Sequence, residues 1–94
     1  MLDKRRPALI LTREVVRPKI NGITVAPITS AIRGLSTEVP VGSANGLDHD
    51  SVVSCDTVVT VDARDIGRHL GYLLPSQERE LAAAIIAAYD LEDL

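Results

Sequence analysis

The sequence has no Trp, no Phe, only two Tyr and a single Cys. Any core must therefore be aliphatic. A lone cysteine, Cys55, excludes an internal disulfide and a zinc site built from cysteines, and it is typical of a reducing compartment. The longest apolar run, residues 81–89, has nine residues, whereas a membrane-spanning helix needs about 20. We therefore expect a cytoplasmic protein with no membrane partner.

Several catalytic motifs are also absent. The chain has no Gly-rich phosphate loop and no dinucleotide-binding fingerprint. Its two histidines, His49 and His69, are twenty residues apart, so they do not form a metal-binding pair at the usual spacing. The aspartates between Asp48 and Asp65 lack the glutamate that closes a calcium-binding EF-hand loop. We therefore expect no metal site and no cofactor.

The length of 94 residues predicts one small domain, spanning residues 1–94. Apolar residues make up 46% of the chain, which is enough for a globular fold and excludes a disordered tail. A domain of this size buries only about 60–65% of the surface that its unfolded chain exposes. A second copy that covers apolar surface would stabilise so small a core, and we expect a homodimer.

The charges are distributed unevenly along the chain. The net charge is −3, which by itself argues against a nucleic-acid partner. Residues 1–40, however, contain seven Lys or Arg and three acidic residues, whereas residues 41–94 contain three Arg and ten acidic residues. A basic half can give a folded domain an electropositive patch despite an acidic composition, although such charge is also common on ordinary solvated surfaces.

The residue pattern predicts a mostly β chain, in which prolines and glycines separate short runs of strand-forming residues. The predicted strands are residues 8–12, 23–30, 37–41, 51–62 (as one long or two short strands) and 69–74. The predicted loops and turns are the basic loop 13–22, the loop 31–35, the long turn 42–50 and the helical turn 63–68. Pro27 lies inside the second strand, where a proline indicates an edge strand, a bulge or a bend.

The last segment, residues 75–94, has a helical pattern. Its apolar residues form one stripe: Leu81, Ile85, Ala88 and Leu91, widened by Ile86 and Tyr89. We expect Pro75 or Ser76 to start the helix, and Glu78 and Glu80 favour the positive end of its dipole. The chain therefore predicts five or six short strands and one C-terminal helix, in a compact curled sheet or small barrel.

Three stretches of sequence point to a family. They are RRPALILTREVVRP near the start, VAPITSAIRGLSTEVPV in the middle, and GLDHDSVVSCDTVVTVD after it. In this order and spacing, with a C-terminal helix, the chain resembles the MazF/PemK family of toxin endoribonucleases, and it is most similar to the mycobacterial MazF toxins. The resemblance runs from Lys4 to Leu91. It implies an SH3-like small barrel of the CcdB, PemK and MazF type.

The resemblance also implies an activity. Toxins of this kind, from type II toxin–antitoxin systems, cut single-stranded RNA in a sequence-specific way without a metal. They leave a 2′,3′-cyclic phosphate and a free 5′-hydroxyl, and the cleavage arrests translation and growth. Messenger RNA is the expected substrate, with ribosomal or transfer RNA as further candidates. The implied partners are a second copy of the chain and a cognate MazE-type antitoxin.

Two residues carry the implied catalysis. In the family the key arginine directly precedes the proline of Arg-Pro, which here is Arg6. The key threonine ends the next long strand in a Pro-Ile-Thr context, which here is Thr29. The reaction needs the ribose 2′-oxygen to attack phosphorus while charge develops on the phosphoryl oxygens. The planar guanidinium of arginine suits those oxygens, and a threonine hydroxyl supplies a further donor.

The scarcity of aromatic residues limits how RNA can be bound. Base stacking cannot be the main force, so phosphate contacts and hydrogen bonds to base edges must supply the affinity. The candidate RNA-binding residues are Arg5, Arg17, Lys19, Ser30, Arg33, Asp56 and Thr57. Taken alone, each of them is also compatible with an ordinary surface role.

Two further expectations complete the sequence interpretation. The family has another strand and a loop before its Arg-Pro, whereas only MLDKR precedes Arg6 here, so we expect the usual N-terminal strand to be shortened or missing. An alternative keeps the fold without the chemistry: a non-catalytic, CcdB-like toxin or SH3-like binding module that acts on a protein target. The pairing of Arg6 with Thr29 favours the nuclease, because a protein-binding module does not need it.

Overall fold

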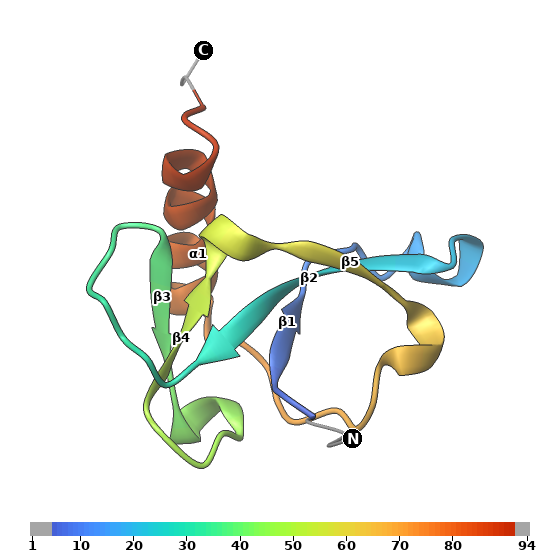
Figure 1. The fold of residues 1–94 in the computed structure, drawn as a ribbon, viewed down its shortest axis with the longest axis horizontal. Coiled ribbons are helices and arrows are strands. Elements are labelled where there is room, and N and C mark those ends of the chain that lie inside the picture. Colours follow the sequence, from blue (N-terminus) through green and yellow to red (C-terminus); the bar gives the residue numbers. More distant parts are fainter. Residues whose placement is uncertain (1–4, 92–94) are drawn as a thin grey trace.

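A computed structural model describes residues 5–91, which form a five-stranded antiparallel sheet followed by an α-helix (Figure 1). The strands are β1 (Ala8–Ile10), β2 (Gly22–Thr29), β3 (Glu38–Val41), β4 (Ser51–Ser54) and β5 (Val59–Asp62). The short 3-10 turns are η1 (Arg17–Lys19), η2 (Ser43–Asn45), η3 (Cys55–Thr57) and η4 (Ala63–Asp65), and the helix is α1 (Pro75–Ala88). The mostly β fold with a C-terminal helix is therefore confirmed.

The sheet is organised around β2, which has three neighbouring strands. The first half of β2 pairs with β5, and its last two residues pair with β4. β1 lies along the other edge of β2, and β3 pairs with β4. Among the described residues no pairing joins β3 to β1 or β5, so the curled sheet is barrel-like but not closed by hydrogen bonds.

Pro27 lies in β2 at a position where neither neighbouring strand would accept a hydrogen bond from a backbone N–H, which proline lacks. On the β1 side it faces Ala8, and the hydrogen bond next to this pair runs from Ile28 N to the carbonyl of Pro7, at 3.1 Å. On the other side, pairing with β5 ends at Val25 and pairing with β4 begins at Ile28. β2 is therefore not an edge strand, and its proline marks the change from one partner strand to the next.

The core is aliphatic, as the composition requires. Its buried members come from β2, β3, β4, η3 and α1, and they are Ala26, Val39, Val41, Val53, Cys55 and Ala84. α1 packs against β3 and η3, and it lays Leu81, Ile85 and Ala88 on this core. Ile86 and Tyr89, which we expected to widen the apolar stripe, are 48% and 53% exposed in the single chain.

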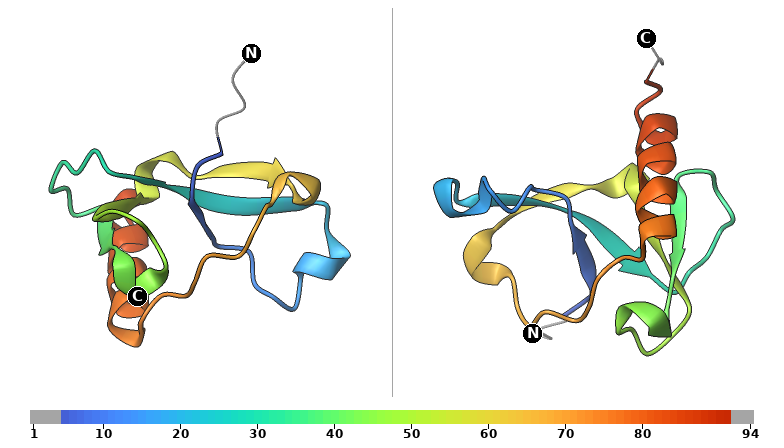
Figure 2. Two further views of the ribbon diagram at one scale, coloured as in Figure 1. Left: turned by 90° about the horizontal axis from the view of Figure 1, so that it is seen from below. Right: turned by 180° about the vertical axis from the view of Figure 1, so that it is seen from behind.

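The strand predicted over residues 69–74 is wrong. Residues 66–74 run from η4 past η2 to the start of α1 without pairing as a strand (Figure 2). The side-chain amide of Asn45 donates to the carbonyl of Tyr72 at 2.8 Å. Gly71 passes so close to η2 that an added Cβ would collide with the carbonyl of Asn45. A buried side chain, and not a strand ladder, therefore holds this segment.

The start of α1 is fixed by the same group of polar side chains. The helix begins at Pro75, one of the two starts expected. Gln77 Oε1 accepts hydrogen bonds from the backbone N–H of Leu74 at 2.8 Å and from Asn45 Nδ2 at 2.6 Å, and its amide donates to the carbonyl of Pro40 at 3.2 Å. These bonds satisfy an N-terminal group of the helix and tie the helix to β3 and η2.

The other predicted elements occur with shifted ends. The predicted strand 51–62 is two strands separated by η3, and the helical turn predicted over 63–68 is the shorter η4. The shortened N-terminal strand that we expected concerns residues before Arg5, which lie outside the described residues. Within the described part of the chain, no helix has the length and apolar content of a membrane span.

Candidate functional site

The two candidate catalytic residues belong to neighbouring strands. Thr29 is the last residue of β2, and Arg6 comes two residues before β1. The pairing of the two strands continues beyond β1, because the backbone N–H of Ile28 donates to the carbonyl of Pro7 at 3.1 Å. Arg6 directly precedes Pro7 and Thr29 directly follows Ile28, so both residues adjoin the last hydrogen bond between the two strands.

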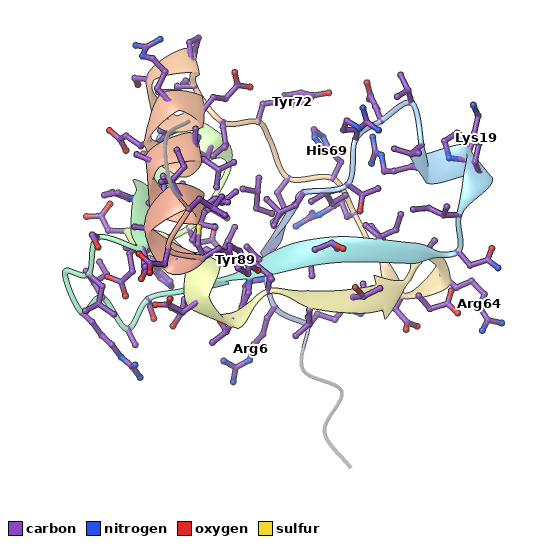
Figure 3. The ribbon with its side chains drawn as sticks, turned by 90° about the horizontal axis from the view of Figure 1, so that it is seen from above. Arg6, Lys19, Arg64, His69, Tyr72 and Tyr89 are labelled. Atoms are coloured by element: carbon purple, nitrogen blue, oxygen red, sulfur yellow. The ribbon has the colours of Figure 1, made fainter. Side chains whose placement is uncertain are left out.

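The polar groups of this pair remain available to a ligand. Arg6 is exposed, and its side chain lies on the side of the molecule away from His69 and Tyr72 (Figure 3). Within residues 5–91 no ion pair or hydrogen bond engages its guanidinium. Thr29 Oγ1 accepts a hydrogen bond from the backbone N–H of Ala31 at 3.1 Å, which fixes the hydroxyl and leaves its proton for another acceptor.

This arrangement is suited to an anion. A guanidinium offers up to five N–H donors and stays charged at all physiological pH values, and the hydroxyl of Thr29 adds a donor from the adjacent strand. Among the described residues, no group of three His, Cys, Asp or Glu side chains gathers as metal ligands. The end of β2 thus places an exposed arginine and a threonine hydroxyl at an open strand end.

Two candidate RNA-binding residues continue the chain from Thr29. Ser30 is exposed, and its carbonyl accepts a hydrogen bond from Ile32 N at 3.1 Å. Arg33 is exposed on the loop of residues 30–37, which connects β2 to β3. The structure therefore holds Ser30 and Arg33 at the same end of β2 as Thr29.

Two more candidates, Asp56 and Thr57, lie in η3, which packs against β2. Both side chains are exposed and both already have protein partners. Asp56 accepts a hydrogen bond from Thr37 Oγ1, and Thr57 donates to Ser54 Oγ at 3.2 Å. Their first role in the structure is thus to hold η3 against the start of β3 and the end of β4.

Arg17 and Lys19 lie at the opposite end of β2 from Thr29. They belong to η1, in the loop that leads into β2 at Gly22. The eight residues of β2 span about 23 Å at the usual rise per residue. In Figure 3, Lys19 and Arg6 lie on different sides of the β2 and β5 ribbons. One chain therefore does not bring Arg17 or Lys19 beside Arg6.

The surroundings of the other basic candidates also differ from those of Arg6. Arg17 is half-buried and forms an ion pair with Glu14, with 3.2 Å between Nη2 and Oε1. The Arg17–Glu14 pair borders a shallow cavity of about 450 Å³ that is lined mainly by aliphatic residues of β1, β2 and the segment after β5. Arg5 turns toward Gly67, and a Cβ on that glycine would be 3.6 Å from Arg5 Nη1.

Sequence reasoning missed Glu38, the first residue of β3. One of its carboxylate oxygens, Oε1, accepts hydrogen bonds from the backbone N–H groups of Arg33, Gly34 and Leu35, at 3.2, 2.9 and 3.2 Å. Gly34 has a φ of +74°, in the left-handed region that glycine adopts most easily. Successive N–H groups in such a turn form an anion-binding concavity. A glycine four residues before a glutamate was the only signal of this contact in the sequence.

In the described part of the chain, three side chains have shifted pKa values: Cys55, Asp62 and Arg64. Burial raises the pKa of the Cys55 thiol, and the nearby Asp56 carboxylate adds to the effect. Hydrogen bonds from Arg64 lower the pKa of Asp62, and the same contact raises the pKa of Arg64. Cys55 is therefore a buried core residue whose thiol is held in its protonated form.

Comparison with known proteins decides the family. A model described as "PemK-like, MazF-like toxin of type II toxin-antitoxin system" matches residues 2–89. The chain belongs to this family. It is 62% identical over 91 residues to the endoribonuclease MazF3 of Mycobacterium tuberculosis, covering 97% of this chain and 88% of that protein. The family resemblance found in the sequence is thus confirmed.

Solved structures of the family have the same fold. The Mycobacterium tuberculosis toxin MazF-mt6 matches with a TM-score of 0.92 at 62% identity, covering 97% of this chain and 92% of that one. A mycobacterial endoribonuclease in complex with its cognate antitoxin matches with a TM-score of 0.83 at 21% identity, covering 95% and 84% of the two chains. The open, barrel-like sheet with its helix is therefore the MazF fold.

Proposed function

We propose that this chain is the toxin of a type II toxin–antitoxin system and an endoribonuclease that cuts single-stranded RNA in the cytoplasm, arresting translation and growth. Family membership and 62% identity to a protein named as an endoribonuclease support the activity. The observation that carries the proposal to individual residues is the end of the β1–β2 pairing, where Pro7 bonds to Ile28 and where the exposed Arg6 and the hydroxyl-bearing Thr29 are the next residues of their chains.

The proposed reaction is an internal transfer at one phosphodiester. The ribose 2′-oxygen attacks the adjacent phosphorus and gives up its proton to a base, while the bond from phosphorus to the 5′-oxygen breaks and that oxygen takes up a proton. The products are a 2′,3′-cyclic phosphate and a 5′-hydroxyl. Arg6 stabilises the charge that develops on the phosphoryl oxygens, and the Thr29 hydroxyl donates to one of them.

The roles of the remaining candidates follow from their positions along β2. Ser30 and Arg33 contact the nucleotides next to the cleaved bond, and Asp56 and Thr57 hydrogen-bond to base edges or ribose. Arg5, Arg17 and Lys19 bind phosphates farther along the strand. One single-stranded RNA can reach all of these residues, because protein sites for single-stranded nucleic acid commonly cover about 4–16 nucleotides.

The experiment that tests this function is cleavage of a long, mixed-sequence single-stranded RNA by the purified protein in EDTA, followed by analysis of the product ends. We expect cleavage with cyclic phosphate and 5′-hydroxyl ends, and none at sites that carry a 2′-deoxyribose. Loss of cleavage in EDTA with recovery in magnesium would mean a different mechanism. Intact RNA under all conditions would contradict the proposed activity.

We propose a cognate MazE-type antitoxin as the inhibitor. A mycobacterial endoribonuclease of the same fold was solved with its antitoxin, which supports such a partner here. An acidic segment that folds on binding would cover the exposed basic residues at the ends of β2 and compete with RNA. Charge complementarity would make this association fast and sensitive to salt.

We also propose a homodimer. The support is the small aliphatic core and the row of half-exposed apolar residues on the outer side and end of α1, Ile86, Tyr89 and Leu91. Sedimentation should give a dimer at micromolar concentration, and Ile86→Arg should weaken it. Wild-type protein that sediments as a stable monomer would contradict this proposal.

A further inference from the structure

The loop of residues 30–37 has almost no packing to hold its shape. It projects from the sheet between β2 and β3 (Figure 1). Residues 30–36 are all exposed, including the apolar Ile32 and Leu35, which are 54% and 47% exposed. The conformation of this loop therefore depends on hydrogen bonds and not on the core.

The side chain of Glu38 accepts three of these hydrogen bonds. Its Oε1 accepts three consecutive backbone N–H groups, of Arg33, Gly34 and Leu35. The backbone N–H of Glu38 in turn donates to the carbonyl of Leu35 at 3.1 Å. Glu38 itself is held in the sheet opposite Ser54 of β4. Hydrogen bonds to a carboxylate are about twice as strong as those between neutral groups, so this side chain ties the loop to the rigid sheet.

The other end of the loop is fixed by Thr29, whose hydroxyl oxygen accepts from Ala31 N at 3.1 Å. Arg33 lies between these two attachments, and its own backbone N–H is one of the three that Glu38 holds. The guanidinium of Arg33 has no ion-pair partner within residues 5–91. The result is an uncompensated cation on a pre-formed loop, four residues from the candidate catalytic threonine.

We propose that Glu38 is a positioning residue for RNA binding: its carboxylate holds the loop of residues 30–37 so that Arg33 stands ready to bind a phosphate of the substrate. This inference rests on the proposed RNA-cleaving function. Without an acceptor oxygen at this position, the three N–H groups bond to water, and the loop must be ordered each time RNA binds. That ordering cost lowers the affinity of the complex.

Three substitutions of Glu38 separate the effect of side-chain length from the effect of side-chain charge. Glu38→Gln keeps an oxygen at the same distance, so it should retain most of the RNA affinity. Glu38→Asp keeps the charge but is one methylene shorter, so it should behave like Glu38→Ala. For Glu38→Ala we expect binding of a 2′-O-methyl RNA to weaken about 2- to 5-fold, the size of one exposed ionic contact. Fluorescence anisotropy measures this affinity without any cleavage, and circular dichroism checks each fold.

A double-mutant cycle tests whether Glu38 acts through Arg33. Arg33→Ala should weaken binding as much as Glu38→Ala, and the double variant should be no weaker than either single variant. Both single variants should lose about one phosphate contact. The slope of log K against log salt concentration should then become shallower by about 0.7, the value for one contact to a single strand. In cleavage they should raise KM more than they lower kcat. Additive losses, or a Glu38→Ala variant that binds as wild type, would overturn the inference.

Amide hydrogen exchange gives a readout that needs no RNA. The N–H groups of Arg33, Gly34 and Leu35 should be protected in wild type and in Glu38→Gln, and should exchange faster in Glu38→Asp. Equal exchange in all three proteins would overturn the inference, even if Glu38→Ala does not fold. Wild-type protein that binds RNA without cutting it would contradict only the proposed function. Wild-type protein that does not bind RNA would overturn both.

Discussion

The two ends of β2 present the same residue type in opposite states. At the Thr29 end, Arg6 and Arg33 are exposed and, among the described residues, have no ion-pair partner. At the Gly22 end, Arg17 is half-buried and paired with Glu14 beside an apolar cavity. An uncompensated arginine is available to a phosphate, whereas a paired one must first break its ion pair. This difference is the reason why we propose the Thr29 end for the chemistry and the Gly22 end for extended binding.

Hydrogen bonding to the backbone differs between the two ends as well. At the Thr29 end, Thr29 and Glu38 use their side-chain oxygens to hold the following loop. At the Gly22 end, Thr12 Oγ1 accepts from Thr24 N at 2.8 Å, but the turn η1, which carries Arg17 and Lys19, has no side-chain cap and relies on backbone bonds such as Lys19 N to Val16 O at 2.9 Å. Side-chain oxygens therefore hold the loop that carries Arg33, and do not hold the turn that carries Arg17 and Lys19.

The largest expected effect comes from removing the paired groups at the Thr29 end. Arg6→Ala and Thr29→Ala should each lower the rate of RNA cleavage about 10²–10³-fold, because each removes one donor to the transition state. Single-turnover kinetics on one defined RNA measures this. Arg79→Ala, which removes an exposed arginine of α1, is the matched control and should cleave at the wild-type rate.

A near-normal rate for both variants, with intact circular dichroism, would remove the distinction between the two ends of β2. A loss in Arg6→Ala alone would keep the site and remove Thr29 from it. An equal loss in Arg79→Ala would mean that net charge, and not position, governs the rate.

Stability should depend on a region outside both ends of β2. Asn45 is 7% exposed and bonds to Gly42, Tyr72 and Gln77. Asn45→Ala should lower the free energy of unfolding by about 1–3 kcal/mol, since it removes the hydrogen bonds by which a buried side chain joins η2 to the segment before α1 and to the helix start. Urea denaturation measures this, with Ser43→Ala as an exposed control in the same turn. Cleavage well below the unfolding transition should stay at the wild-type rate, and a large loss there would show that α1 and η2 support the site.

Much of the fold was predictable because strand alternation and proline positions are local signals. β2 was placed within one residue at each end, and the helix start at Pro75 was one of the two expected. The segment 66–74 was misassigned because its apolar residues read as a strand, while what holds it is the side chain of Asn45, far away in sequence. Contacts of this kind leave no periodic pattern.

The candidate site was also predictable in part. Arg6 and Thr29 were found through family motifs, and the antiparallel pairing of β1 with β2 explains why residues 23 positions apart lie at the same end of β2. Charge counting could not separate Arg6 from Arg17, because pairing with Glu14 is a matter of three-dimensional geometry. Glu38 was missed because its partners are backbone groups, which every residue has.

A smaller effect is expected at the Gly22 end. Arg17→Glu combined with Lys19→Glu should weaken RNA binding about tenfold at low salt, the sum of two exposed ionic contacts, and leave kcat almost unchanged. The same double variant should weaken antitoxin binding, if the inhibitor competes with RNA. Titrations of both ligands at two salt concentrations measure this. A drop in kcat comparable to that of Arg6→Ala would contradict the division of roles between the two ends.

The smallest effect concerns Cys55, which packs in the core with Ala26 of β2. Burial raises the pKa of its thiol above the ordinary value of 9.0, so the unfolded chain loses this proton first as the pH rises. The stabilising contribution is present below pH 9.0 and is lost above it. Urea midpoints measured from pH 7.5 to pH 10 should fall more steeply for wild type than for Cys55→Ala. Iodoacetamide should modify the folded protein slowly at pH 8 and the urea-unfolded protein quickly. Fast modification of the folded protein would mean that the middle of β2 opens more readily than its burial indicates.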